Sequence, residues 1–169
     1  MGQLFPDDFV EGVMLFKRMG LYYVIYSSCC CACRGGSGAV VHRAPSIGGP
    51  WVRQARDVNC DADAPICAAP GFPKEGRPLD ITVHAQGLGL SMIGGAFIWQ
   101  GERWLSAPNN PSNCSSLCDS PTGACDEAKD YVKGHDYGYW IPLTFDRDGA
   151  VEPFEPFVDS WPLTLDPKP

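Results

Sequence analysis

Short apolar runs, rich in aromatic and β-branched residues, alternate along the chain with turns that contain glycine or proline. Such runs are typical of antiparallel strands. No apolar pattern with the 3.6-residue period of a helix extends over a useful length. The pattern predicts strands at residues 13–18, 21–28, 39–44, 51–54, 81–84, 88–93, 96–100 and 139–145.

The predicted strands fall into two sets, residues 13–54 and 81–145, each of roughly three or four antiparallel strands. A unit of about 40–50 residues in four strands has the size of a β-propeller blade, and a ring needs at least ~4 blades. We therefore expect all 169 residues to form one incomplete, all-β propeller-like domain. Loop insertions are predicted at 55–79 and 109–129, and a closing segment at 151–165.

Acidic residues outnumber basic ones. The chain has 20 Asp and Glu against 13 Lys and Arg, which gives a net charge of −7 and a pI near 4.8. A nucleic-acid binder needs a cationic surface, so we expect no nucleic-acid partner. No stretch approaches the ~18 consecutive apolar residues of a membrane-spanning helix, so we expect no membrane partner either.

The 9 cysteines form three groups: residues 29–33, the pair Cys60 and Cys67, and residues 114–125. Disulfides belong to oxidising compartments, which favours an extracellular protein, although the N-terminus lacks the basic and apolar regions of a signal peptide. Structural zinc prefers well-spaced cysteine pairs, which adjacent cysteines do not supply. We expect disulfides, with Cys60 or Cys67 bonded to the first group, and neither metal nor cofactor.

Several short motifs follow one another along the chain. They are Glu11-Gly12 before an apolar strand, Gly20-Leu21-Tyr22-Tyr23, Ser46-Ile47-Gly48-Gly49-Pro50-Trp51, His84-Ala85-Gln86, Gly101-Glu102-Arg103-Trp104 and Trp140-Ile141-Pro142-Leu143. In this order they resemble the middle and end of glycoside hydrolase family 43 (GH43), and members similar to exo-β-1,3-galactanases are the nearest in pattern. Two departures are Val13, where the family has proline, and Glu102, where it has aspartate.

The resemblance implies a five-bladed β-propeller in which Glu11 is the general acid that protonates the leaving glycosidic oxygen. Such an acid must stay protonated near neutrality, which a partly apolar cleft favours by penalising the carboxylate. The resemblance also implies that Gln86 takes the water-side position, where an amide can hold a water. Without the resemblance, Glu11 is better explained as a solvated glutamate. Gln86 is explained equally well as a strand-end residue bonded to backbone.

The same resemblance implies substrate contacts for five further residues. They are Ser27, Glu102, Arg103, Trp104 and Trp140. Aromatic side chains can line such a site and support the apolar faces of sugars. The structural alternatives stay open: Glu102 and Arg103 as an ion pair that locks a blade corner, and the tryptophans as core residues.

The predicted function is hydrolysis of O-glycosidic bonds in a galactan- or arabinan-type polysaccharide by an inverting mechanism. The motifs begin midway through the family's pattern, so the blades with the catalytic base have no counterpart here. We therefore expect a C-terminal portion of such an enzyme, weakly active or inactive alone. Two alternatives remain: a non-catalytic carbohydrate-binding remnant, and a small secreted β protein held by disulfides.

Overall fold

The structure is a computed structural model that describes residues 10–27, 36–60, 81–104, 106, 136–155 and 160–162. Over these ranges the chain forms strands and no helix, so no helix there is long and apolar enough to cross a membrane. The strands are β1 (Glu11–Arg18), β2 (Leu21–Ser27), β3 (Val40–Ala44), β4 (Val52–Arg53), β5 (Gln86–Ile93), β6 (Ala96–Arg103) and β7 (Tyr137–Pro142).

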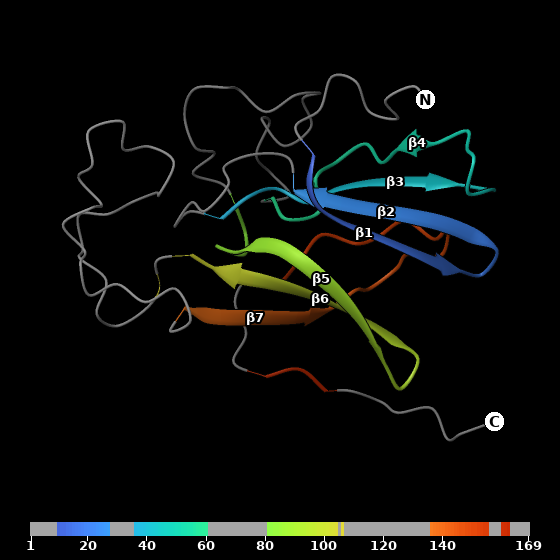
Figure 1. The fold of residues 1–169 in the computed structure, drawn as a ribbon. Helices are drawn as coiled ribbons and strands as arrows, with labels where there is room; N and C mark the ends of the chain where they lie inside the picture. Colours follow the sequence, from blue (N-terminus) through green and yellow to red (C-terminus); the bar gives the residue numbers. More distant parts are fainter. Residues whose placement is uncertain are drawn as a thin grey trace, which may run out of the picture.

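The strands form two antiparallel sheets that follow the chain order. The first has the order β1-β2-β3-β4 and the second has the order β5-β6-β7 (Figure 1). Both begin with a hairpin whose turn contains residues of positive φ, Met19 and Gly20 in the first, Gly94 and Gly95 in the second. The predicted all-β, antiparallel fold is confirmed for the part of the chain that the structure describes.

The segment before β5 is an exception, because the strand predicted at 81–84 is wrong. The backbone of Val83 pairs with one side chain: its N–H donates to Asn59 Oδ1 at 2.8 Å, and its carbonyl accepts from Asn59 Nδ2 at 2.9 Å. Asn59 also donates to the carbonyl of Ser37, and it is fully buried. A buried asparagine thus satisfies this backbone in place of a neighbouring strand.

The two sheets meet where β1 and β5 begin. A bulge interrupts the pairing of β1 with β2 between Glu11 and Met14, and Gly12 lies inside it with a φ of +62°. A Cβ on Gly12 would collide with the backbone carbonyl oxygen of Gly87 in β5. Glycine therefore permits both the left-handed backbone and a backbone-to-backbone approach of the two strands.

The main core fills the space between the sheets and widens away from that meeting point. Trp99 is fully buried near the close end, beside Met14 and Phe154. At the far end, near the two hairpins, lies a group that we call the aromatic cluster. Its members are Phe16, Tyr23, Phe97 and Phe145, with ring centroids 4.6 to 6.4 Å apart.

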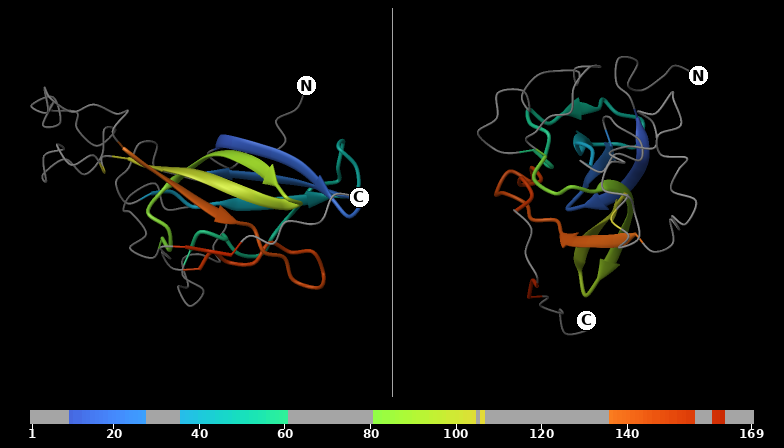
Figure 2. Two further views of the ribbon diagram at one scale, coloured as in Figure 1. Left: turned by 90° about the horizontal axis from the view of Figure 1, so that it is seen from below. Right: turned by 90° about the vertical axis from the view of Figure 1, so that its left-hand side faces the viewer.

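The segment after β7 turns back from the second sheet to the first (Figure 2). Its start is bonded to β6, because the N–H of Leu143 donates to the carbonyl of Phe97. Farther on, Gln54 bonds Val151 in both directions: Nε2 donates to its carbonyl at 2.7 Å, and Oε1 accepts from its N–H at 3.0 Å. The side chain of Gln54 thus bonds both backbone groups of Val151, as a neighbouring strand would, and joins the last part of the fold to the first sheet.

Candidate active site

The structure brings Glu11 and Gln86 together although they lie 75 residues apart in sequence. Glu11 is the first residue of β1, Gln86 is the first residue of β5, and these strands meet at that end. Gln86 Nε2 donates to Glu11 Oε2 at 2.8 Å. Gln86 is only 1% exposed, whereas Glu11 is half-buried, so the carboxyl is anchored from below and keeps access to solvent.

Trp104 lies on the other side of Gln86. Its indole Nε1 donates to Gln86 Oε1 at 2.7 Å. In the β5–β6 ladder Gln86 is opposite Glu102, and Trp104 lies two residues beyond it, which is the diagonal position on the same face of an antiparallel pair. Three of the residues proposed from the sequence therefore form one chain of hydrogen bonds, Trp104 to Gln86 to Glu11.

Ser27 links the two sheets where they meet. It ends β2 opposite Glu11 and is 1% exposed. Its hydroxyl donates to the carbonyl oxygen of Gly87 at 3.4 Å, which links the first sheet to β5. Its predicted contact with substrate stays a prediction.

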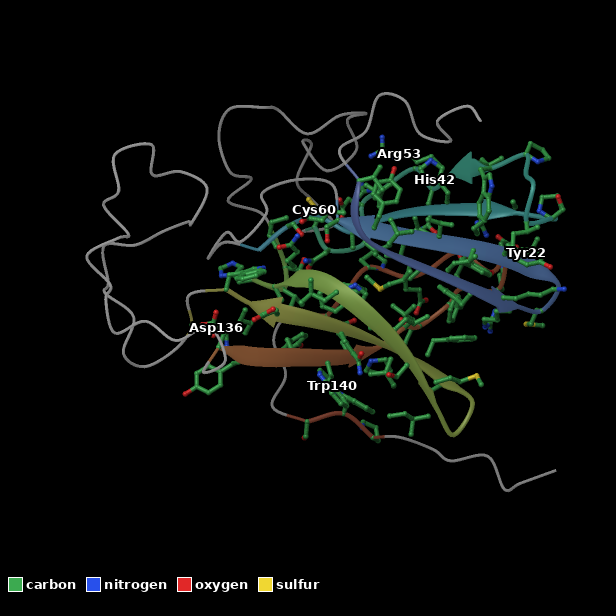
Figure 3. All side chains as sticks on the ribbon, viewed as in Figure 1. Tyr22, His42, Arg53, Cys60, Asp136 and Trp140 are labelled. Atoms are coloured by element: carbon green, nitrogen blue, oxygen red, sulfur yellow. The ribbon has the colours of Figure 1, made fainter. Side chains whose placement is uncertain are left out.

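Glu102 and Trp140 line one hollow of about 340 Å³ on the second sheet. Gly89, Gly101 and Gly138 also line it, and Gln100 and Asp136 add polar groups to the lining. Trp140 is 52% exposed and projects from β7 on the side away from the first sheet, with Asp136 at the start of the same strand (Figure 3). Arg103 ends β6 opposite Tyr137, and its predicted ion pair with Glu102 stays a prediction.

Sequence reasoning missed Gln100 and Asp136 as neighbours of Glu102 and Trp140. Gln100 and Glu102 are two residues apart in β6, so their side chains share a face of the sheet. That spacing alone could have indicated Gln100. Asp136 could not be found in this way, because its place depends on how β7 pairs with β6.

Among the described residues, no group of three or more His, Cys, Asp or Glu side chains could hold a metal ion. Cys60 is 1% exposed and disulfide-bonded. The other predicted disulfide cysteines lie outside the residues that the structure describes, so the pairing of Cys60 stays a prediction.

The fold is similar to part of several solved GH43 enzymes. A GH43 β-1,3-galactosidase solved with galactodeoxynojirimycin matches 91% of this chain and 32% of its own length, at 20% identity and a TM-score of 0.51. A second GH43 β-1,3-galactosidase matches 92% of this chain and 24% of its own, at 17% identity and a TM-score of 0.54. An exo-β-1,3-galactanase from Clostridium thermocellum matches 85% of this chain and 23% of its own, at 18% identity and a TM-score of 0.50.

No family model matches the sequence, and no curated protein does either. The chain spans about a quarter to a third of the length of these solved enzymes. At such identities the likeness shows the fold: the resemblance to GH43 seen in the sequence is confirmed at that level, and the similar structures are five-bladed β-propellers. The described residues themselves form two neighbouring sheets.

Proposed function

We propose that this chain forms part of a glycoside hydrolase active site in which Glu11 is the general acid. One observation carries the proposal: the half-buried Glu11 is hydrogen-bonded to a buried amide where two sheets of a GH43-like fold meet. A general acid must be held in a defined position and still reach its substrate. Glu11 fits both conditions, because Gln86 anchors one carboxyl oxygen while the residue stays partly open to solvent.

In the proposed reaction, Glu11 transfers its proton to the glycosidic oxygen as the bond from this oxygen to the anomeric carbon breaks. The bonding electron pair goes to the leaving oxygen. A water adds to the opposite face of the anomeric carbon and gives its proton to a carboxylate base. Attack from this face inverts the configuration. The resemblance assigns this base to blades that have no counterpart among the motifs of this chain.

The proposed substrate is a β-1,3-linked galactoside, with an arabinan as the second choice. Support comes from the similar structures, which are named as β-1,3-galactosidases and an exo-β-1,3-galactanase. The hollow beside Trp140 adds a half-exposed aromatic ring with carboxyl and amide groups around it, a combination suited to sugar hydroxyls and ring faces. The proposed setting is extracellular, because Cys60 is in a disulfide.

The 169-residue chain alone is proposed to have little or no activity, because the mechanism needs a second carboxylate. A non-catalytic carbohydrate-binding protein is therefore the second candidate, and the hollow favours it. Titration of the chain with a β-1,3-galactobiose tests binding by itself. Saturable binding without hydrolysis supports the second candidate, and an absence of binding contradicts it. The first candidate is tested in a form extended to a complete ring.

The test of the acid is Glu11→Gln in a form extended to a complete ring. Turnover of the disaccharide should fall by about 10²–10⁴-fold, the usual share of general acid catalysis. The fall should shrink for an aryl galactoside whose leaving group needs no proton. Glu152→Gln makes the same chemical change at an exposed position and should leave turnover unchanged. Full activity of Glu11→Gln on the disaccharide would show that Glu11 is not the acid.

A further inference from the structure

We propose that Asn59 is a positioning residue of the candidate active site: it fixes the backbone just before β5 and thereby sets where Gln86 stands against Glu11. The inference rests on the proposed function, in which Glu11 is the general acid. It leaves the water-side role that the resemblance implies for Gln86 as it stands. Three hydrogen bonds of the buried Asn59 side chain carry the inference.

The amide of Asn59 directs all of its polar atoms at backbone groups. Oδ1 accepts from the N–H of Val83 at 2.8 Å, and Nδ2 donates to the carbonyls of Val83 at 2.9 Å and Ser37 at 2.8 Å. Asn59 is 0% exposed. Because a buried polar group without a partner costs about 1–3 kcal/mol, these bonds allow the backbone of Val83 only a narrow range of positions.

The residues between Val83 and Gln86 are held as well. The N–H of Ala85 donates to the carbonyl of Val83 at 2.6 Å, and the carbonyl of Ala85 accepts from the N–H of Ser37 at 3.2 Å. A Cβ on Gly36 would collide with the backbone nitrogen of Ala85, so the two stretches lie in close contact. The position of Val83 is therefore passed on to Gln86 through a backbone with little freedom to relax.

Asn59 is itself anchored to the first sheet. Its N–H donates to Asp57 Oδ1 at 2.9 Å, and the same oxygen accepts from the N–H of Ala39 at 2.6 Å, directly before β3. All these groups are buried. Asn59 thus connects the first sheet, which carries Glu11, with the start of the second, which carries Gln86.

The candidate site needs such a support because Glu11 and Gln86 come from different sheets. Gln86 Nε2 lies 2.8 Å from Glu11 Oε2. A hydrogen bond is lost once its heavy atoms separate to about 3.6 Å, so a displacement of about 1 Å at the start of β5 would break this contact. A misplacement of that size can lower the rate of an enzyme about 10²-fold.

Two matched substitutions separate positioning from stability. Asn59→Asp keeps the shape and the acceptor of the side chain, but it sets a carboxylate oxygen against the carbonyls of Val83 and Ser37. Gln54→Glu makes the same change in the amide that bonds both backbone groups of Val151, a pairing that does not involve β5. Both variants should lower the free energy of unfolding, and only Asn59→Asp should disturb the site.

The first experiment is nuclear magnetic resonance on the 169-residue chain, which needs no catalytic activity. The side-chain amide of Gln86 and the indole N–H of Trp104, which donates to Gln86 Oε1, report the geometry of the site. Both resonances should shift in Asn59→Asp and keep their wild-type positions in Gln54→Glu. Unchanged resonances in a folded Asn59→Asp variant would overturn the inference, and so would equal shifts in the two variants.

Hydrogen exchange of the wild-type chain provides the test if Asn59→Asp does not fold. Each local opening that releases the N–H of Val83 from Asn59 should also free Gln86 and expose the Trp104 indole. The indole N–H should therefore be no better protected from exchange than the N–H of Val83. An indole that stays protected while the N–H of Val83 exchanges would overturn the inference.

The second experiment measures kinetics in the form extended to a complete ring, at a temperature where each variant is folded. Asn59→Asp should lower kcat about 10²-fold with KM little changed, because the reacting groups are misplaced. Gln54→Glu should keep the wild-type kcat. A purely structural role would change the folded fraction and the melting temperature only, so a wild-type kcat per folded molecule in Asn59→Asp would overturn the inference.

The failure of this inference and that of the proposed function can be told apart. If Glu11→Gln keeps full activity, the proposed function fails, whatever the resonances of Gln86 show. If Glu11→Gln is inactive while Asn59→Asp keeps the wild-type resonances and kcat, the acid stands and only the positioning role of Asn59 is wrong.

Discussion

The space between the sheets has a close end, where β1 and β5 begin, and an open end, at the two hairpins. The two ends differ in what lies between the sheets. At the close end, β1 and β5 touch through backbone, because Gly12 and Gly87 leave no side chain between them. At the open end the same sheets are held apart by the stacked and tilted rings of the aromatic cluster. Figure 1 shows β1 and β5 diverging from their first residues toward their hairpins. The sheets thus form a wedge.

The two ends contribute differently to the fold: the open end contributes mainly stability, and the close end holds the candidate site. The open end buries large apolar surfaces, which provide most of the free energy of folding. The close end also buries Trp99 and Met14, but it adds polar contacts that position Glu11 against Gln86 and join Ser27 to β5. Variants at the open end should therefore change mainly the free energy of unfolding, and variants at the close end mainly the geometry of the site.

The largest effect is expected for Phe16→Ala at the open end. Phe16 is 8% exposed and its ring lies 4.9 Å from Tyr23 and 4.6 Å from Phe97. Removal of a buried aromatic ring should lower the free energy of unfolding by about 3–5 kcal/mol, as measured by urea denaturation. Leu15→Ala, on the outer face of the same strand and 51% exposed, should stay within about 0.5 kcal/mol. Equal losses of unfolding free energy in the two variants would show that the aromatic cluster does not hold the open end together.

Gly12→Ala should have the second-largest effect, at the close end. A left-handed φ costs a residue with a Cβ about 1–2 kcal/mol, and the forced contact with Gly87 adds about 1–3 kcal/mol more. Gly20→Ala is the matched control: its φ is +85°, but nothing lies within 4 Å of the added Cβ. If the two variants are equally stable, the close approach carries no strain.

Tyr23→Phe should have a smaller effect at the open end. The Tyr23 hydroxyl donates to the carbonyl of Gly149 at 2.8 Å, across 126 residues of sequence. The ring and its stacking on Phe16 remain in the variant, so only one hydrogen bond is lost. We expect a decrease of about 0.5–1.5 kcal/mol in the free energy of unfolding. A cost as large as that of Phe16→Ala would mean that the hydroxyl, not the ring, holds this end.

Ser27→Ala should have the smallest effect on stability. Its bond to Gly87 is long, 3.4 Å, so its loss should cost at most about 0.5 kcal/mol. If Ser27 also contacts substrate, binding of the disaccharide should weaken in the variant while the melting temperature barely changes. A large loss of stability with intact binding would instead mark Ser27 as purely structural.

The sequence predicted most of the strands, because the apolar, aromatic and β-branched runs and the turns that bound them are local signals. Six of the runs reappear in β1, β2, β3, β5, β6 and β7 with shifted ends, and β4 keeps only Val52 and Arg53. A strand is predicted at 81–84 but does not form, because the backbone of Val83 bonds to the distant side chain of Asn59. No local pattern signals such a contact.

The members of the candidate site could be named from the sequence, but their contacts could not. The resemblance implies a separate role for each of Glu11, Gln86 and Trp104. Their chain of hydrogen bonds depends on the bulge at Gly12 and on the diagonal register of β5 with β6. Both are tertiary features, since a bulge and a register are selected by what packs on them.

The bond between Gln54 and Val151 has a consequence for how the chain folds. The two residues are 97 positions apart, and pairings of such long range slow the search for the native fold. Ribosomes add about 5–20 residues per second, so Gln54 waits roughly 5–20 s during synthesis before Val151 emerges. Throughout that interval the nascent first sheet lacks the partner that Val151 supplies. In the interval between the synthesis of Gln54 and that of Val151, the first sheet is therefore most exposed, and a chaperone would protect it most at that time.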